Sequence, residues 1–322
     1  MKKMLDRWQR DKDDGVVEEY LNRGITIFTT PKPFRGITGI IQKNALQSWL
    51  SRVTNCEIIL FGDEEGTAEI ASQFGVQHIA DVACNEYGTP LISSMFRIAQ
   101  DIANYPIMCY INSDIILMSD FLPAICQIKW RSFLIIGQRW DIDLKDALDF
   151  SNQLWEKNLR GCLTKGATLH GIGGLDYFIF PRGMYSDIPP FAVGRPKWDN
   201  WMVYQARLLK VPVIDATKAI TAVHQNHDYP KHLKKENGDW KGPEAAQNIK
   251  LAGEGENGFD TNNATWILTQ QGLKRALARR HLCAQLRAIP VLNPCLGFLN
   301  LPIRVFPRLI RHVLRKIGIL PR

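Results

Sequence analysis

Several features that define specialised protein classes are missing from this sequence. Its seven cysteines are scattered and form no Cys-x-x-Cys pair, which argues against a zinc site or a disulfide framework and favours a reducing, cytosolic setting. No stretch reaches about 18 uninterrupted apolar residues, so a simple transmembrane helix is not expected. The opening segment MKKMLDRWQRDKDD carries charge but no apolar core, so a signal peptide is not expected either.

Acidic residues are absent from the last part of the chain. Leu273 to Arg322 contains eleven Lys and Arg residues and no Asp or Glu, although the whole chain carries 40 basic and 32 acidic residues. The preceding residues therefore hold 29 basic and 32 acidic side chains, a slightly acidic body with a basic tail. Overall charge does not indicate nucleic-acid binding. If the protein has an anionic partner, the basic tail is the segment expected to bind it.

Strand-like and helix-like segments alternate through most of the body. This order, with apolar strands and short connections, predicts an α/β fold with a mainly parallel central sheet. The expected strands cover 24–34, 56–66, 76–82, 107–117, 132–142, 177–181 and 211–216. The expected helices cover 37–53, 67–75, 89–105, 119–128 and 198–210.

Polar side chains follow three of these strands. Thr29 and Thr30 follow the first, Asp63 follows the second, and Asn112-Ser113-Asp114 interrupts the fourth. Each group alone is ordinary turn chemistry. Ligands bind at the carboxyl ends of the strands in open α/β sheets, so three polar ends on one edge favour a ligand site. Asp114 would supply the oxygen ligand that Mg²⁺ or Mn²⁺ prefers.

The order of these motifs resembles the nucleotide-sugar-binding half of a GT-A glycosyltransferase, nearest to family 2-like enzymes. The segment INSD matches that fold's DxD motif, with Asn112 in place of the first Asp and Asp114 kept. The resemblance covers roughly residues 24 to 230 and implies a Rossmann-like GT-A domain over 24–270. It further implies a divalent cation, Mn²⁺ or Mg²⁺, and a donor site. The donor site would be formed by Thr29, Thr30, Asp63, Arg97, Asn112, Ser113 and Asp114.

Three later motifs extend the resemblance. GIGGLDYFIFP matches the glycine-containing segment that faces donor and acceptor, which implies sugar-facing roles for Gly173, Gly174 and Asp176. Asp199, in KWDNW, matches the general base of inverting members, and Trp198 and Trp201 would flank the acceptor. The ordinary structural interpretation of Asp199 is a helix N-cap. In AVHQNHDY, His224 would complete the metal shell, with His227 as the second choice; a structural histidine is the alternative.

The expected activity is transfer of a sugar from a nucleotide diphosphate sugar, with UDP as the default, to a glycan, lipid-linked or other hydroxyl acceptor. Asp199 as base implies inversion, and a retaining course is open if no carboxylate reaches the acceptor. Two alternatives are a sugar-phosphate nucleotidyltransferase and a non-catalytic membrane-binding protein. The nucleotidyltransferase is disfavoured because TTPKPFRG holds a single glycine.

The basic tail is expected to act separately from the catalytic domain. Residues 1–23 form an N-terminal extension and residues 271–322 form the tail in this division of the chain. Arg304, Arg308, Arg311 and Arg315 share one helical face, with apolar residues on the other. Such an amphipathic segment suits an anionic membrane surface, which predicts a cytoplasmic enzyme held peripherally on a membrane. A C-terminal helix packed on the domain is the alternative, and no nucleic-acid partner is expected.

Overall fold

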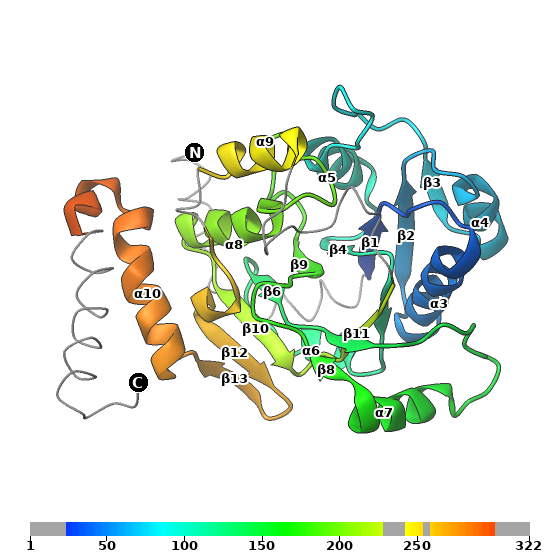
Figure 1. Cartoon of the computed structure of the whole chain (residues 1–322). Coiled ribbons are helices and arrows are strands. Elements are labelled where there is room, and N and C mark those ends of the chain that lie inside the picture. Colours follow the sequence, from blue (N-terminus) through cyan, green and yellow to red (C-terminus); the bar gives the residue numbers. More distant parts are fainter. Residues whose placement is uncertain (1–23, 228–241, 254–257, 300–322) are drawn as a thin grey trace.

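The structure, a computed structural model, describes residues 24–227, 242–253 and 258–299. The N-terminal extension and the four arginines expected on one face of the tail lie outside these residues. A nine-stranded sheet crosses the molecule with helices on both faces (Figure 1). In spatial order its strands are β13 (Gly272–Arg275), β12 (Trp266–Thr269), β10 (Val213–Lys218), β6 (Leu134–Ile136), β9 (Tyr177–Pro181), β4 (Ile107–Ile111), β1 (Ile25–Thr29), β2 (Cys56–Phe61) and β3 (Gln77–Ile79).

The large sheet is mainly parallel, as the alternating pattern predicts. Strands β3, β2, β1 and β4 are parallel neighbours, and so are β6, β10 and β12. Strand β9 runs antiparallel to β4 and β6, and β13 runs antiparallel to β12. The β12–β13 hairpin spans residue 270, where the sequence had placed the end of the catalytic domain. The parallel strands bring their carboxyl ends to one edge.

Apolar side chains fill both faces of the large sheet. One cluster packs α3 (Gly36–Arg52), α4 (Thr67–Phe74) and α6 (Phe121–Ile125) against it. The other face packs α5 (Ile92–Ile102), α8 (Trp198–Leu208) and α9 (Pro243–Leu251). Phe28, Phe96, Tyr110 and Phe180 form an aromatic centre on this second face, with ring centroids 4.9 to 6.5 Å apart. Among the described residues no helix is long and apolar enough to cross a bilayer.

A second, four-stranded sheet lies across the carboxyl edge region. Its order is β5 (Ile115–Leu117), β11 (Ala222–Gln225), β7 (Trp140–Ile142) and β8 (Thr168–Leu169). Its apolar face packs under α7 (Trp155–Gly166). Among the described residues, the remaining elements are α10 (Arg279–Leu292) and two short 3-10 helices, η2 (Thr261–Asn263) and η3 (Pro294–Leu299).

Two segments expected to be single strands each divide between the two sheets. Residues 107–117 form β4 in the large sheet and β5 in the small one, and 132–142 form β6 and β7 in the same way. At the second crossing Gly137 has no room for a side chain, because a Cβ would lie 2.1 Å from the Tyr177 hydroxyl oxygen. Asn112-Ser113-Asp114 forms the first crossing, so this segment joins the sheets instead of interrupting one strand.

Candidate metal and donor site

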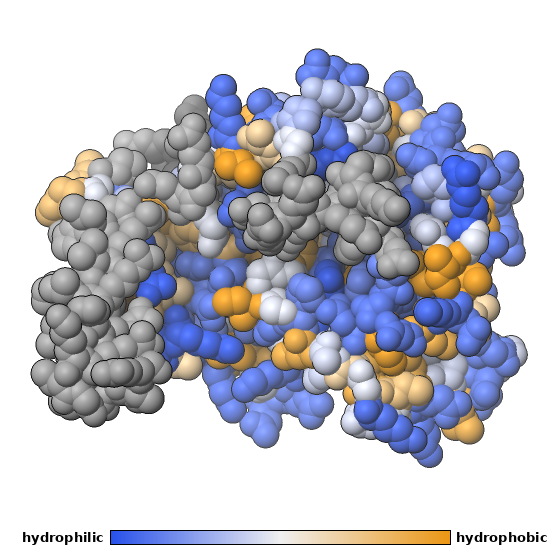
Figure 2. Space-filling view, in the orientation of Figure 1, coloured by the Kyte–Doolittle hydropathy of each residue, from blue (hydrophilic) through white to orange (hydrophobic). Residues whose placement is uncertain are grey.

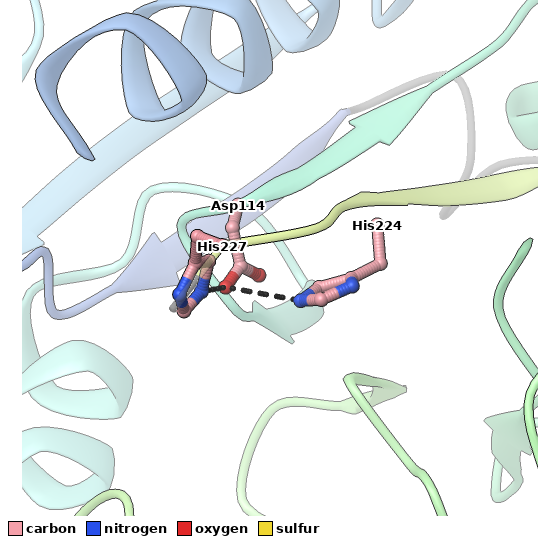
Figure 3. A group of neighbouring side chains, drawn as sticks. All are labelled: Asp114, His224 and His227. Atoms are coloured by element: carbon pink, nitrogen blue, oxygen red, sulfur yellow. Dashed lines mark hydrogen bonds and ion pairs between the residues drawn. The ribbon is translucent and has the colours of Figure 1, made fainter. Parts of the chain in front are cut away.

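The two crossings bring Asp114, His224 and His227 together. His224 pairs with Ile115 in the antiparallel β5–β11 ladder, which places it beside Asp114. The Asp114 Oδ2 atom lies 3.1 Å from His227 Nε2 and 3.6 Å from His224 Nε2. Figure 3 shows both imidazole rings directed at this carboxylate. Within the described part of the chain, this is the one group of at least three His, Cys, Asp or Glu side chains able to hold a metal ion.

The cluster is buried and incompletely hydrogen-bonded. The side chains of Asp114, His224 and His227 are 14%, 5% and 4% exposed. Among the described residues, Asp114 Oδ1 and His224 Nε2 have no hydrogen-bond partner. Buried polar atoms without partners are uncommon in folded proteins. One carboxylate and two imidazoles therefore fit a divalent cation, which would supply the partner that these atoms lack.

The charges of the cluster favour an anionic Asp114. Burial alone would raise the pKa of this carboxyl, but His224, His227 and the positive charge of Lys32 hold the pKa well below its ordinary value. Burial alone would also lower the pKa of His224, whereas the neighbouring Asp114 raises it. Proton and cation therefore compete for the His224 ring, as expected when a ligand must be neutral to bind metal.

A second carboxylate, Asp141, stands behind His224. The two residues face each other in the parallel β7–β11 ladder, and His224 Nδ1 lies 3.1 Å from Asp141 Oδ1. Arg139 Nε donates to the same oxygen at 2.8 Å, and His170 Nδ1 lies 2.6 Å from Asp141 Oδ2. A carboxylate on the far nitrogen of a metal-binding histidine fixes the tautomer and orientation of that ring. Asp141 is thus placed to hold His224 with Nε2 toward the metal position.

Asn112, the departure from the DxD pattern, is bonded to Asp176. Its side-chain amide donates to Asp176 Oδ1 at 2.6 Å, and its backbone N–H donates to the Asp176 carbonyl at 2.9 Å. Arg139 Nη1 donates to Asp176 Oδ2 at 2.5 Å. An Asp at position 112 would place a second carboxylate against the buried Asp176. The Asn is therefore compatible with this packing, and the histidines supply the other candidate ligands.

The loop after β1 adds a cation beside the cluster. Lys32 Nζ lies 3.4 Å from His227 Nε2. The Gln42 side chain, on α3, holds this loop by accepting from the Lys32 N–H at 2.7 Å and donating to the Lys32 carbonyl at 2.8 Å. Gln42 Oε1 also accepts from Ser113 Oγ at 2.9 Å. This network fixes the loop and the INSD segment to one another, with an ammonium group suited to an anionic ligand.

The other two polar strand ends lie where the sequence places them, with different exposure. Strands β1 and β2 are parallel and adjacent, with Thr29 opposite Leu60. Thr29 is fully buried and its hydroxyl has no hydrogen-bond partner among the described residues. The Thr30 hydroxyl lies near Gly62, where a Cβ would be 3.5 Å away, and Asp63 is exposed. Thr30 and Asp63 are the members of this set that a nucleoside could reach without rearrangement.

Arg97 lies away from this edge, in contrast to the expected donor role. Its exposed side chain pairs with Asp101 at 3.6 Å and lines a cavity of about 440 Å³ with Arg182 and Gly183. These two residues directly follow β9, whose last residue pairs with Ile107 at the start of β4. Arg97 is therefore near the amino end of β4, whereas Asp114 follows its carboxyl end. The helical arginine is a solvent-exposed residue of α5.

The two tryptophans beside Asp199 belong to the core. Trp198 and Trp201 are 6% and 7% exposed. The Trp198 ring packs against Tyr110 and Phe178 at 5.1 and 5.4 Å. A sugar-facing wall needs an exposed ring face, which these burials do not provide. Their structural role is to anchor α8 on the large sheet and so fix the start of the helix that carries Asp199.

Asp199 is the second residue of α8 and is not its N-cap. The cap position is Lys197, with φ 82° and no side-chain capping bond. Asp199 Oδ1 accepts from the Asn200 N–H at 2.9 Å. Burial raises the pKa of Asp199 to about 6, and the negative charge of Asp176 contributes in the same direction. A carboxyl group with this pKa can exchange a proton near neutral pH.

The glycines of the GIGG segment have different surroundings. A Cβ at Gly173 would meet nothing within 4 Å. A Cβ at Gly174 would lie 2.2 Å from His170 Cδ2. The His170 ring therefore occupies the space that a side chain at Gly174 would fill, and from there it contacts Asp141.

Asp141, Arg139 and His170 were not among the expected site residues. In QRWDI, Arg139 and Asp141 are spaced to share a face of an otherwise apolar strand, which is a signal that sequence reasoning could have used.

On the face drawn in Figure 2, hydrophilic residues predominate and hydrophobic ones form separate small groups. A second cavity, of about 460 Å³, is lined by Trp140 and Leu169, the neighbours of Asp141 and His170 in the strands.

Comparisons with known proteins gave structural matches alone. No protein-family model matches the chain, and no curated protein sequence matches it. The S. aureus TarS 1–349 structure in complex with UDP-GlcNAc aligns at 12% identity and a TM-score of 0.46, covering 72% of this chain and 71% of that one. Glucosyl-3-phosphoglycerate synthase from Mycobacterium tuberculosis, solved with Mg²⁺ and UDP, aligns at 14% identity and a TM-score of 0.41, covering 67% and 76%. The chain spans 37% of the first TarS structure.

Proposed function

We propose that this protein is a metal-dependent glycosyltransferase of the GT-A class, which transfers a sugar from a nucleotide diphosphate sugar to a hydroxyl acceptor. The observation that carries the proposal is the buried Asp114–His224–His227 cluster beside the carboxyl ends of β1, β2 and β4. A diphosphate and a divalent cation are the natural occupants of such an edge, because backbone and side-chain ligands converge there.

Different residues of the site would contact the cation, the diphosphate and the nucleoside of the donor. Asp114, His224 and His227 would hold the cation, which offsets the charge of the leaving diphosphate. Asp141 orients His224, and Lys32 lies beside His227, where its ammonium group can meet a phosphate oxygen. Thr30 and Asp63, which follow the neighbouring strands β1 and β2, would contact the nucleoside. UDP is the default nucleotide in this proposal.

Asp199 acts on the acceptor in the proposed reaction. Its carboxylate takes the proton of the acceptor hydroxyl as that oxygen forms a bond to the anomeric carbon. The bond from the anomeric carbon to the diphosphate oxygen breaks, and the nucleoside diphosphate leaves. A single displacement of this kind inverts the anomeric centre. The raised pKa of Asp199, caused by burial, suits a group that accepts a proton near neutral pH.

The first test removes the proposed metal-binding carboxylate. A panel of nucleotide sugars is screened by thermal stabilisation, and hydrolysis or transfer of the best donor is measured with Mn²⁺. Asp114→Ala is expected to lower turnover about a hundredfold or more, since the charge on the leaving group is no longer offset. The matched control is Asp101→Ala, which removes an exposed carboxylate on α5. Equal turnover in wild type and Asp114→Ala, with both folded, would contradict the proposal.

A further inference from the structure

Helix α10 has a buried side and, about 100° around its axis, a row of exposed apolar side chains. Its inner face includes His281 and Ala288, which are 0% and 3% exposed, and His281 Nδ1 lies 3.2 Å from the Asn262 carbonyl oxygen. Gln285, on the same side, contacts the carbonyl oxygens of Ala264 and Ala276 at 3.5 and 3.3 Å. These contacts fix α10 to η2 and the β12–β13 hairpin. The fold thus buries this side of the helix, and Pro290 near the end of the helix is buried as well.

The outer face of α10 carries a row of exposed apolar side chains. Leu282, Leu286 and Ile289 are spaced at i, i+4 and i+7 and are 44%, 56% and 36% exposed. Leu277 before the helix is 66% exposed, and Phe298 after it is 74% exposed. Residues at this spacing lie on one face of a helix. We call Leu282, Leu286 and Ile289 the outer row.

Positive charge borders the outer row. Arg279 lies seven residues before Leu286, so the two share a side of the helix, and Arg287 directly follows Leu286; both arginines are exposed. The helix sequence RRHLCAQLRAIPVL holds no Asp or Glu, and none occurs after it in the chain. Exposed arginines therefore flank the outer row, and α10 itself carries no acidic residue.

We propose that the outer face of α10 docks on an anionic lipid surface. Aliphatic side chains enter the boundary between headgroups and acyl chains, while arginines reach the anionic headgroups with their long side chains. A second copy of this chain is a poorer occupant, because a symmetric contact would bring the arginines that flank the two outer rows close together. The inference is independent of the proposed transfer reaction: it rests on α10, on the side of the molecule away from α3 and α4 (Figure 1).

The test uses the full chain with vesicles of phosphatidylcholine alone or mixed with phosphatidylglycerol, and measures binding by co-sedimentation. Wild type is expected to bind the anionic vesicles and to lose binding as salt rises. Leu282→Ser/Leu286→Ser is expected to weaken binding roughly tenfold or more, since the apolar area leaves the boundary. Arg279→Gln/Arg287→Gln is expected to weaken it about 30-fold, from about 1 kcal/mol per arginine.

Matched controls sit on other helices. Leu50→Ser/Leu208→Ser changes two leucines that are 41% and 40% exposed on α3 and α8, and Arg97→Gln removes an exposed arginine from α5. Both controls are expected to bind as wild type does, with all variants checked for folding by thermal unfolding.

Three results would each overturn the proposal. The first is unchanged vesicle binding in both outer-face variants. The second is equal binding to neutral and anionic vesicles. The third is a wild-type dimer that Leu282→Ser/Leu286→Ser converts to a monomer while vesicle binding persists, which would make the outer face a contact between copies.

Discussion

At the scale of the single residue, Asp199 is the carboxyl whose environment most directly links stability to activity. Burial raises its pKa from 3.8 to about 6, so the folded protein holds this proton more tightly than the unfolded chain does. The stability that the neutral acid contributes is complete below pH 3.8 and is lost as pH rises through about 6. Above that pH the ionised carboxylate opposes folding while it serves as the proposed base.

Asp199→Asn separates the role of this carboxyl as the proposed base from its effect on stability. We expect it to abolish transfer, to leave nucleotide binding intact, and to raise the free energy of unfolding by about 1–3 kcal/mol at alkaline pH. The stabilisation should vanish as the pH falls to about 4, where the wild-type carboxyl is also neutral. Denaturant unfolding at several pH values measures the second effect. The pH profile of wild-type transfer, expected to rise through about pH 6, checks the first.

Two outcomes would contradict the assignment of Asp199. Loss of both transfer and nucleotide binding in the variant would make the side chain structural. A lower unfolding free energy at alkaline pH would mean that the carboxylate is stabilised by its surroundings and that burial does not dominate its pKa.

Residues of the candidate site differed in how far sequence could reveal them. Asp114 directly precedes β5, His224 lies in β11 and His227 follows it, where local pattern and order along the chain suffice, and the structure places the three together. Asp141 and His170 could not be placed in the same way, because their contacts depend on which strands of the small sheet are neighbours. Arg97 looked equivalent to other helical arginines, and helix periodicity does not say which edge of the sheet it approaches.

At the scale of the element, the β8–β9 loop holds His170 against Asp141. The ring lies over Gly174, where an added Cβ would be 2.2 Å from His170 Cδ2, and Gly173 next to it faces open space. Gly174→Ala should push the ring away, loosen Asp141 behind His224, and weaken Mn²⁺ binding by about tenfold. Gly173→Ala is the matched control and should change Mn²⁺ affinity less than about twofold. Calorimetry of Mn²⁺ binding measures both, and equal affinities would contradict this account.

The strands and helices were predictable where a single hydrophobic periodicity corresponds to packing in a single layer of the fold. The strands β1, β2, β4 and β9 and helix α8 lie within the expected segments, and α3 begins one residue before its segment, because each buries a continuous apolar face against its neighbours. The two crossings between sheets were missed. Each segment has apolar residues on both sides of a short polar stretch, and hydrophobic pattern does not show that the first part packs in one sheet and the second in another.

At the scale of the whole molecule, the candidate metal cluster joins segments about a hundred residues apart. Asp114 lies at the crossing from the large sheet to the small one, and His224 and His227 lie on and just after β11. A cation held by all three would bind the folded chain and have no comparable site in the unfolded chain. Metal binding should therefore stabilise the arrangement of the two sheets as well as the local turn.

The expected result is a stability that depends on the concentration of free Mn²⁺. At about 100 times the dissociation constant, Mn²⁺ should raise the free energy of unfolding by about 2.7 kcal/mol. His224→Ala/His227→Ala should remove most of this increment, whereas His78→Ala, which alters a histidine bonded to the Gly62 carbonyl, should keep it. Denaturant unfolding with and without Mn²⁺ measures each increment. An equal increment in all three proteins would place the cation elsewhere, because only the double variant lacks two of the three proposed ligands.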